Sequence, residues 1–209
     1  MAAVVAGSRL QRLAQSPTPP PPAPAPEKCD LCAEPLASGH RHLLDLGPRA
    51  LLCACRACAV LFDRQDAGGR RYRLVPERRR RLTGFALAPE TWDALDVPVA
   101  LTFLVRVADL GRVVAFCPSP LGVTDTPVNP TAWAQLLADN PTLGGLEDDV
   151  EAVLIQRTRE PYEHWLAPLD VCYRLAAVVR THWKGLGGGP RVWVEISRFF
   201  EDLAEKGHR

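Results

Sequence analysis

The chain has 209 residues, of which 47% are hydrophobic and 23% are charged, and its formal net charge is +1. This composition is that of a globular protein with one medium domain, or with a small module joined to a larger one. The near-neutral charge excludes a global attraction to nucleic acid or to an anionic membrane. Every apolar run is interrupted well before the roughly 18 residues of a membrane-spanning helix, so no membrane insertion is expected.

The first 26 residues differ in composition from the rest of the chain. Arg9 and Arg12 follow a short apolar stretch, whereas a secretory signal places its basic residues before the apolar stretch. Residues 16–26 are nearly all Pro and Ala. We therefore expect residues 1–26 to form a disordered Pro/Ala-rich tail that ends in a stiff spacer.

Two Cys-x-x-Cys pairs come next, Cys29 with Cys32 and Cys55 with Cys58. Each pair directs two thiolates to one point, and two pairs provide the tetrahedral ligand set that zinc prefers. Gly47-Pro48 separates two short apolar runs between the pairs, which predicts a hairpin. The pattern predicts a zinc-ribbon-like metal-binding module over residues 27–66, with a closed structural site that stabilises a small core.

Three further residues are alternative ligands for this site. Cys53 lies two residues before Cys55, and on an extended strand both side chains would face the same way. Cys53 could therefore replace Cys55 or remain a spare thiol. His40 and His42 could complete a Cys3His set or a two-metal cluster, or they could be solvated turn residues.

Iron is the alternative metal, because two cysteine knuckles also hold the single iron of rubredoxin. Rubredoxin knuckles usually carry Gly after the second Cys, and this chain has Ala33 and Ala59 at those positions. The sequence therefore favours zinc.

The chain contains seven cysteines, five of them within residues 29–58. An odd number in tight clusters, without an export signal, argues against a disulfide framework and indicates a reducing cytoplasm. Cys117 and Cys172 lie in apolar sequence and are expected to be buried, inert thiols.

After a linker with Gly68-Gly69, the pattern of residues 71–76 predicts a short edge strand that ends at Pro76. Arg78, Arg79, Arg80 and Arg81 follow as a basic cluster. They could bind an acidic protein partner or nucleic acid, or form a solvated face that balances acidic residues elsewhere. Residues 27–84 carry a net charge of +5 and residues 85–209 a net charge of −6, so the two parts could attract each other.

The remaining sequence predicts an α+β domain over residues 70–209, a small, mainly antiparallel sheet covered by C-terminal helices. The predicted elements, in chain order, are a short helix over 89–96, a hairpin of strands 97–108 and 112–117, a Pro-rich loop over 118–130, a helix over 131–140, a strand over 150–156, a helix over 170–183 and a last helix that begins at Pro190.

Catalytic patterns are sparse. The chain has no Gly-x-Ser-x-Gly, no phosphate-binding glycine loop and no His-Glu-x-x-His. Glu163 and His164, followed by Asp170, place carboxylates near a histidine in sequence. A polar cluster at the start of a helix is the simpler interpretation, so the sequence favours a protein that is not an enzyme.

Several blocks of the chain resemble one uncharacterised family of actinobacteria and other bacteria. They include His-Arg-His-Leu-Leu-Asp-Leu at 40–46, Leu-Leu-Cys-Ala-Cys-Arg-Ala-Cys-Ala at 51–59 and Arg-Tyr-Arg-Leu-Val-Pro at 71–76, and the resemblance covers about residues 27–204. Members of that family are typically encoded beside the actinobacterial type of nickel-iron hydrogenase. The resemblance implies an accessory protein that contacts a hydrogenase subunit or maturation factor. The alternatives from the residues are a rubredoxin-like electron carrier and a nucleic-acid-binding zinc ribbon.

Overall fold

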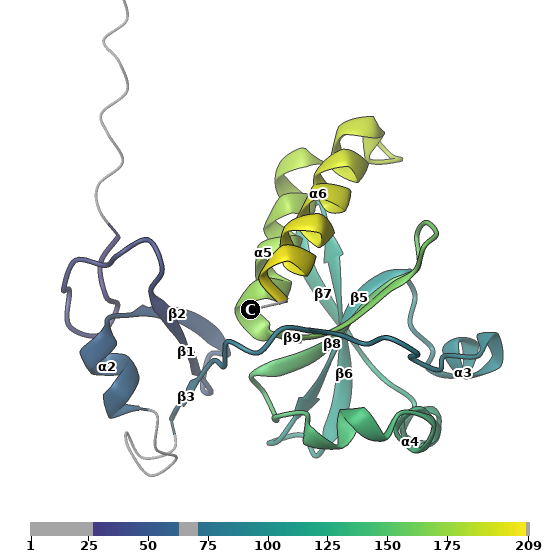
Figure 1. Cartoon of the computed structure of the whole chain (residues 1–209), viewed down its shortest axis with the longest axis horizontal. Helices are drawn as coiled ribbons and strands as arrows, with labels where there is room; N and C mark the ends of the chain where they lie inside the picture. Colours follow the sequence, from purple (N-terminus) through teal and green to yellow (C-terminus); the bar gives the residue numbers. More distant parts are fainter. Residues whose placement is uncertain (1–26, 63–70, 208–209) are drawn as a thin grey trace, which may run out of the picture.

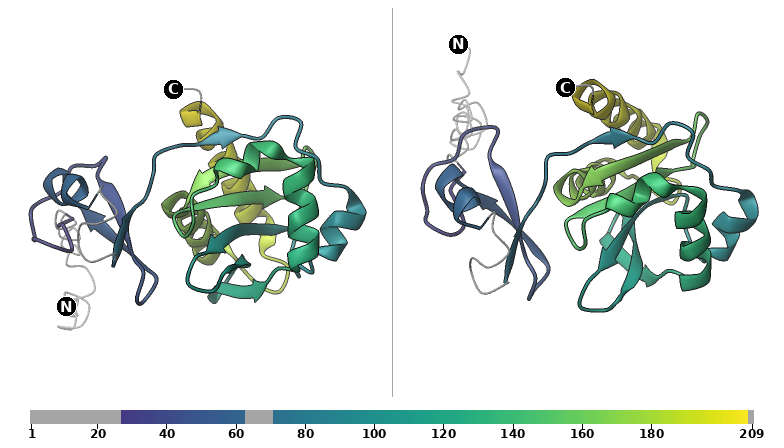
Figure 2. Two further views of the ribbon diagram at one scale, coloured as in Figure 1. Left: turned by 90° about the horizontal axis from the view of Figure 1, so that it is seen from below. Right: turned by 60° about the horizontal axis from the view of Figure 1, so that its bottom comes forward.

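The computed structural model describes residues 27–62 and 71–207. The predicted tail over residues 1–26 and the linker glycines, Gly68 and Gly69, lie outside the described residues. Within the described ranges the chain forms a small N-terminal module beside a larger body. The segment between β3 (Tyr72–Leu74) and β4 (Arg80–Arg81) connects the two (Figure 2).

The N-terminal module contains a three-stranded antiparallel sheet in the order β2-β1-β3. Strands β1 (Arg41–Asp45) and β2 (Ala50–Ala54) form the predicted hairpin, and the helix α2 (Arg56–Leu61) follows β2. Strand β3 (Tyr72–Leu74) is the predicted short edge strand. It pairs with β1 and thus belongs to the N-terminal sheet, although it lies beyond the module boundary that the sequence suggested.

The body contains a six-stranded sheet in the order β4-β9-β8-β5-β6-β7, in which every pairing is antiparallel. Strands β5 and β6 form the predicted hairpin, with Gly111 at φ 58° in the turn. The strands of this sheet are β4 (Arg80–Arg81), β5 (Leu101–Val107), β6 (Arg112–Ser119), β7 (Gly122–Pro127), β8 (Glu151–Gln156) and β9 (Glu163–Pro168).

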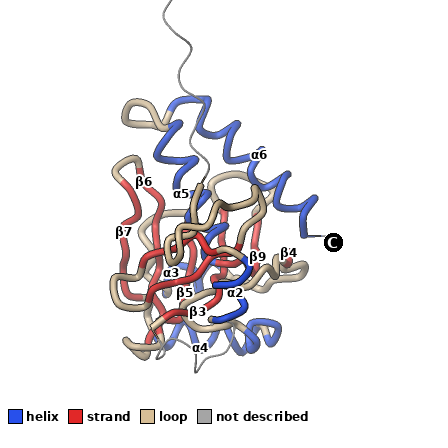
Figure 3. Tube along the Cα trace, turned by 90° about the vertical axis from the view of Figure 1, so that its left-hand side faces the viewer, coloured by secondary structure: helices blue, strands red, loops and turns tan. Residues whose placement is uncertain are grey.

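Helices cover both faces of the body sheet (Figures 1 and 3). The two C-terminal helices, α5 (Leu169–His182) and α6 (Gly189–Gly207), pack side by side on one face, as predicted. The other face is covered by α3 (Pro89–Ala94), α4 (Pro130–Asp139) and the 3-10 helix η2 (Pro141–Gly145). The sequence predicted α3 and α4 as helices but not their place on the sheet.

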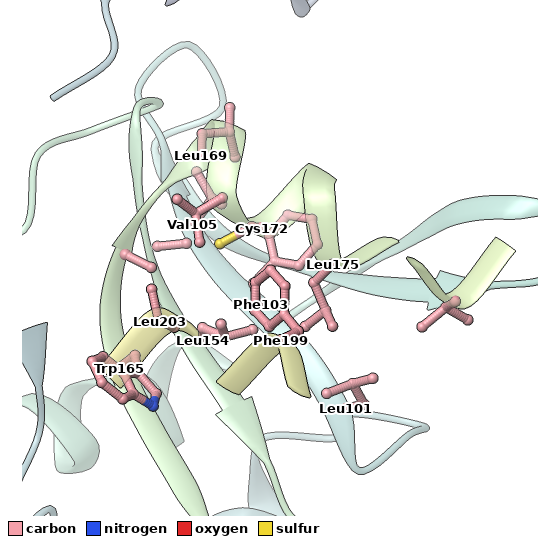
Figure 4. Close-up of a cluster of buried hydrophobic side chains, with 14 of the residues drawn as sticks. Leu101, Phe103, Val105, Leu154, Trp165, Leu169, Cys172, Leu175, Phe199 and Leu203 are labelled. Atoms are coloured by element: carbon pink, nitrogen blue, oxygen red, sulfur yellow. The ribbon is translucent and has the colours of Figure 1, made fainter. Parts of the chain in front are cut away.

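The main core lies between the sheet and the C-terminal helices. Phe103 and Leu154 extend from the central strands β5 and β8 toward Leu175 of α5 and Phe199 of α6 (Figure 4). Leu44 of the N-terminal module is fully buried and belongs to the same cluster. The module therefore shares apolar packing with the body.

Two strands correct the sequence interpretation. Residues 118–130 were expected to be a loop because they are rich in proline, but they contain β7, an edge strand whose last residue is Pro127. An edge strand tolerates proline because one side of it makes no ladder hydrogen bonds. Residues 163–168 form β9 and are not the start of a helix, which begins only at Leu169.

Candidate metal centre

The first cysteine knuckle is a tight turn between residues 29 and 34. The amide of Ala33 donates to the carbonyl of Cys29 at 2.8 Å, and the amide of Cys29 donates to the carbonyl of Glu34 at 2.8 Å. Ala33 has φ 62°, in the left-handed region that a residue with a Cβ rarely adopts. The knuckle thus takes the backbone shape that Gly would favour, with Ala in that position.

The second knuckle begins a helix. Cys55 is the N-cap residue of α2, and its Sγ accepts the amide of Cys58 at 3.5 Å. Ala59, which follows Cys58, is helical and buried. The two knuckles therefore differ in conformation, since only the first contains a left-handed residue after its second Cys.

The fold brings the four predicted ligands together. The Sγ atoms of Cys29, Cys32, Cys55 and Cys58 all lie within 4.8 Å of one another, and those of Cys32 and Cys55 are 3.6 Å apart. A zinc–sulfur bond of about 2.3 Å gives a tetrahedron with edges of about 3.8 Å, so this spacing fits a four-thiolate metal ion. All seven cysteines are free thiols.

The thiols of this cluster are electrostatically coupled. At Cys29, burial opposes ionisation, but amide donors from Cys55, Leu31 and Cys32 outweigh it and lower the pKa to about 6. At Cys58, burial and the neighbouring sulfurs raise the pKa to about 12. Four close thiolates repel one another in the absence of a cation, and a divalent ion would remove that repulsion.

The three predicted alternatives form a group of their own. His40, His42 and Cys53 each offer a ligand atom within 4.8 Å of the other two, separately from the four-cysteine cluster. Cys53 and Cys55 diverge because β2 ends at Ala54 and the chain turns into α2 at Cys55. The extended geometry that would aim both side chains at one site does not continue to Cys55.

A groove of about 880 Å³ lies beside both groups, and Cys32, Cys55 and His40 are among its lining residues. Arg56 and Val60 of α2 line it as well, and Val60 is 68% exposed. The groove therefore combines an apolar helix face with a cation next to the thiolates.

The basic cluster makes contacts within the chain. Arg78 binds the fully buried carboxylate of Glu151 through two hydrogen bonds of 2.9 and 2.5 Å, and Arg81 pairs with Glu163 at 2.9 Å. Arg80 donates to the carbonyl of Thr142. For Arg79, the buried Nε atom has no hydrogen-bond partner among the described residues. Binding of a partner by these four arginines remains a prediction, and two of them already neutralise acidic groups of the body.

The sparse catalytic pattern does not converge on one site. Glu163 and His164 are neighbours on β9, where successive side chains point to opposite faces. Glu163 accepts the indole N–H of Trp165 at 2.9 Å, while the His164 ring packs at a tilt against Phe85 with centroids 4.7 Å apart. Asp170 instead lies 3.2 Å from His42.

No sequence pattern predicts this contact between Asp170 and His42, because the two residues lie 128 positions apart. Cys117 and Cys172 are buried, as expected, and burial raises the pKa of both thiols. Their inertness stays a prediction.

The sequence profile of one protein family matches residues 28–207, which include both ligand groups and the whole described body. The chain belongs to DUF5947, a family of unknown function. No curated protein and no solved structure matches the chain. In the part of this DUF5947 chain that the structure describes, no helix has the length and hydropathy needed to cross a bilayer.

Proposed function

We propose that this DUF5947 protein is a non-catalytic, zinc-binding accessory protein whose N-terminal module docks on a protein partner. The four-cysteine cluster carries the proposal, because its sulfur atoms lie within 4.8 Å of one another. Four protein ligands leave no coordination position for a substrate, so such a site acts through the shape that it gives the module.

The docking surface is the groove beside the cluster together with the exposed face of α2. Val60 and Leu61 are 68% and 62% exposed, which is unusual for two consecutive large apolar residues. Both follow directly from the second knuckle, so metal binding fixes the helix that presents them. The partner is a hydrogenase subunit or maturation factor, a choice supported by the resemblance of the sequence blocks.

Co-purification from a native host tests this proposal. Tagged wild-type protein should recover hydrogenase-related proteins, and Val60→Asp should reduce the recovery at least about tenfold, as expected when a charge replaces a central apolar contact. Leu121→Asp is the matched control, because Leu121 is 98% exposed in the turn between β6 and β7, away from α2. Recovery of no hydrogenase-related protein with the wild type would reject the partner.

A rubredoxin-like electron carrier is the second candidate, and the conformation of Ala33 favours it. The left-handed φ of 62° gives the first knuckle the backbone shape that rubredoxins obtain from Gly. The second knuckle lacks this feature because Ala59 is helical. Anaerobic purification with metal analysis distinguishes the candidates: iron with strong visible absorbance supports the carrier, and stoichiometric zinc without iron eliminates it.

A further inference from the structure

The structure places a second set of metal-ligand side chains next to the four-cysteine cluster. The set comprises His40, just before β1, His42 on β1 and Cys53 on β2. His42 and Cys53 are directly opposite each other in the antiparallel pairing. His40 precedes His42 by two residues, and the centroids of the two rings are 4.9 Å apart. The ligand atoms of all three residues lie within 4.8 Å of one another.

The hydrogen bonds of the two histidines leave one nitrogen of each ring available. Nδ1 of His42 lies 3.2 Å from the Asp170 carboxylate, and Nδ1 of His40 lies 3.1 Å from the carbonyl of Ala37. A histidine that binds a metal commonly donates its other N–H to a carboxylate or a backbone carbonyl, which fixes its tautomer. Both rings have such a partner at Nδ1, so Nε2 of each ring is the nitrogen that can accept a metal ion.

One of these free atoms is buried. The Nε2 atom of His40 is shielded from solvent and has no hydrogen-bond partner among the described residues. A buried polar atom without a partner destabilises the fold unless something satisfies it. A cation bound by Nε2 of His40, Nε2 of His42 and Sγ of Cys53 would do so.

The backbone of Cys53 is fixed in place by the first knuckle. Its amide donates to the Asp30 carboxylate at 2.6 Å, and its carbonyl accepts the amide of Asp30 at 2.9 Å. Residue 30 lies between Cys29 and Cys32, so the metal of the first cluster would also position Cys53. A second cation next to the first site is electrostatically favourable, because four thiolates with one divalent ion carry a formal charge of minus two.

We propose that His40, His42 and Cys53 form a second, separate metal site that takes a divalent transition metal of borderline softness, such as Zn²⁺ or Co²⁺. Two imidazoles and one thiolate are the ligand types that these ions prefer. Three protein ligands leave one coordination position open, whereas the four-cysteine site is closed. His40 lines the groove beside both sites.

Anaerobic titration of the full chain with Co²⁺ tests this site. Wild-type protein should bind two equivalents. The first should give the intense thiolate-to-cobalt absorption of four thiolates, and the second should add the weaker absorption of a single thiolate, Cys53. His40→Ala and Cys53→Ser should each reduce the stoichiometry from two equivalents to one. Both variants should keep the four-thiolate spectrum, which shows that the knuckles remain folded.

Two matched controls accompany these variants. His182→Ala removes a histidine at the end of α5, and Cys117→Ser removes a buried thiol of the body sheet, so both should retain two equivalents. Imidazole added to wild-type protein should perturb only the spectrum of the second cobalt ion, because only that ion has an open position.

Three outcomes would overturn the proposal. The first is a wild-type protein that saturates at one equivalent. The second is a second equivalent that both His40→Ala and Cys53→Ser retain. The third is a single ion whose four-thiolate spectrum changes in these variants, which would make His40 or Cys53 a ligand of the first site.

Discussion

At the scale of single residues, Ala33 is an unusual position of the N-terminal module. An L-residue with φ 62° carries a cost of about 1 to 2 kcal/mol that Gly does not carry, although Gly loses more backbone entropy on folding. We predict that Ala33→Gly raises the free energy of unfolding by up to about 1 kcal/mol. Denaturant titration of metal-loaded protein measures this change.

Ala59→Gly is the matched control, because Ala59 occupies the equivalent position of the second knuckle but is helical and buried. This substitution should lower stability by about 1 kcal/mol. Equal effects of the two substitutions would show that the left-handed conformation of Ala33 carries no strain.

His164 gives a prediction about pH. Its ring contacts Phe85, and its Nε2 is buried with no hydrogen-bond partner among the described residues. Burial, together with the charge of Arg157, lowers its pKa to about 4. The folded state therefore keeps this histidine neutral, whereas the unfolded chain binds a proton below about pH 6.5. The free energy of unfolding should fall as the pH decreases from 6.5 toward 4. At pH 5, protonation of His164 in the unfolded chain should lower it by about 2 kcal/mol.

His164→Phe should remove this contribution, because phenylalanine cannot bind a proton. The difference in unfolding free energy between wild type and His164→Phe should therefore change by about 2 kcal/mol between pH 7 and pH 5. Other acidic and metal-binding groups titrate equally in both proteins and cancel. If the unfolding free energies of the two proteins changed in parallel with pH, His164 would not be buried in its neutral form.

At the scale of elements, local patterns predict some strands and helices well and others poorly. The β5–β6 hairpin was predictable because two apolar runs flank a turn that needs Gly111. Helices α4 and α6 were predictable from Pro at their starts and from helical spacing. By contrast, β9 buries its last four residues and shows no alternation, so a short apolar run before a helix resembles part of that helix.

The candidate metal site was predictable only in part, for a related reason. Cys-x-x-Cys spacing is a local geometric property, so Cys29, Cys32, Cys55 and Cys58 were identifiable without the fold. The grouping of His40 and His42 with Cys53 depends on strand pairing, and the Asp170 contact depends on the docking of α5. Local residue spacing predicts neither the pairing of these strands nor the docking of α5.

Arg78, in the segment between β3 and β4, forms an ion pair with Glu151 that gives a testable prediction. Glu151 of β8 is fully buried, and Arg78 provides its two charged hydrogen bonds. Arg78 is itself 44% exposed, but its removal leaves the buried carboxylate without its counter-ion, and breaking a buried pair in this way costs up to about 3 to 5 kcal/mol. Arg78→Ala should therefore lower the melting temperature strongly, as measured by calorimetry.

Arg80→Ala is the control within the same basic cluster, because exposed Arg80 makes one hydrogen bond, to the carbonyl of Thr142. It should cost less than about 1 kcal/mol. Restoring stability with the double substitution Arg78→Met and Glu151→Gln would support the ion-pair explanation. Equal melting temperatures for Arg78→Ala and Arg80→Ala would contradict it.

At the scale of the whole molecule, the uneven charge distribution explains how the module contacts the body. Arg49 and Arg73 of the module both bind Asp149 of the body, at 3.0 and 3.4 Å, and Asp149 is only 2% exposed. The excess positive charge before residue 85 thus neutralises acidic groups of the body. Arg73 lies on β3 and Arg49 in the turn before β2, and the second cysteine knuckle directly follows β2, so loss of metal from the candidate four-cysteine site should also weaken this contact.

Metal removal should therefore unfold the N-terminal module while the body stays folded. The module has few buried apolar residues, so a metal bound by its four cysteines would supply much of its stability, whereas β5 and β8 lie in the centre of a six-stranded sheet covered on both faces. After chelation under reducing conditions, amide exchange in β1 and β2 should accelerate about 100-fold or more, equivalent to roughly 3 kcal/mol of lost protection. Exchange in β5 and β8 should change little.

Asp149→Asn is the control, because it weakens the contact between module and body but should retain the metal. Protection of β1 that persists after complete metal loss would contradict a structural role for the four-cysteine site.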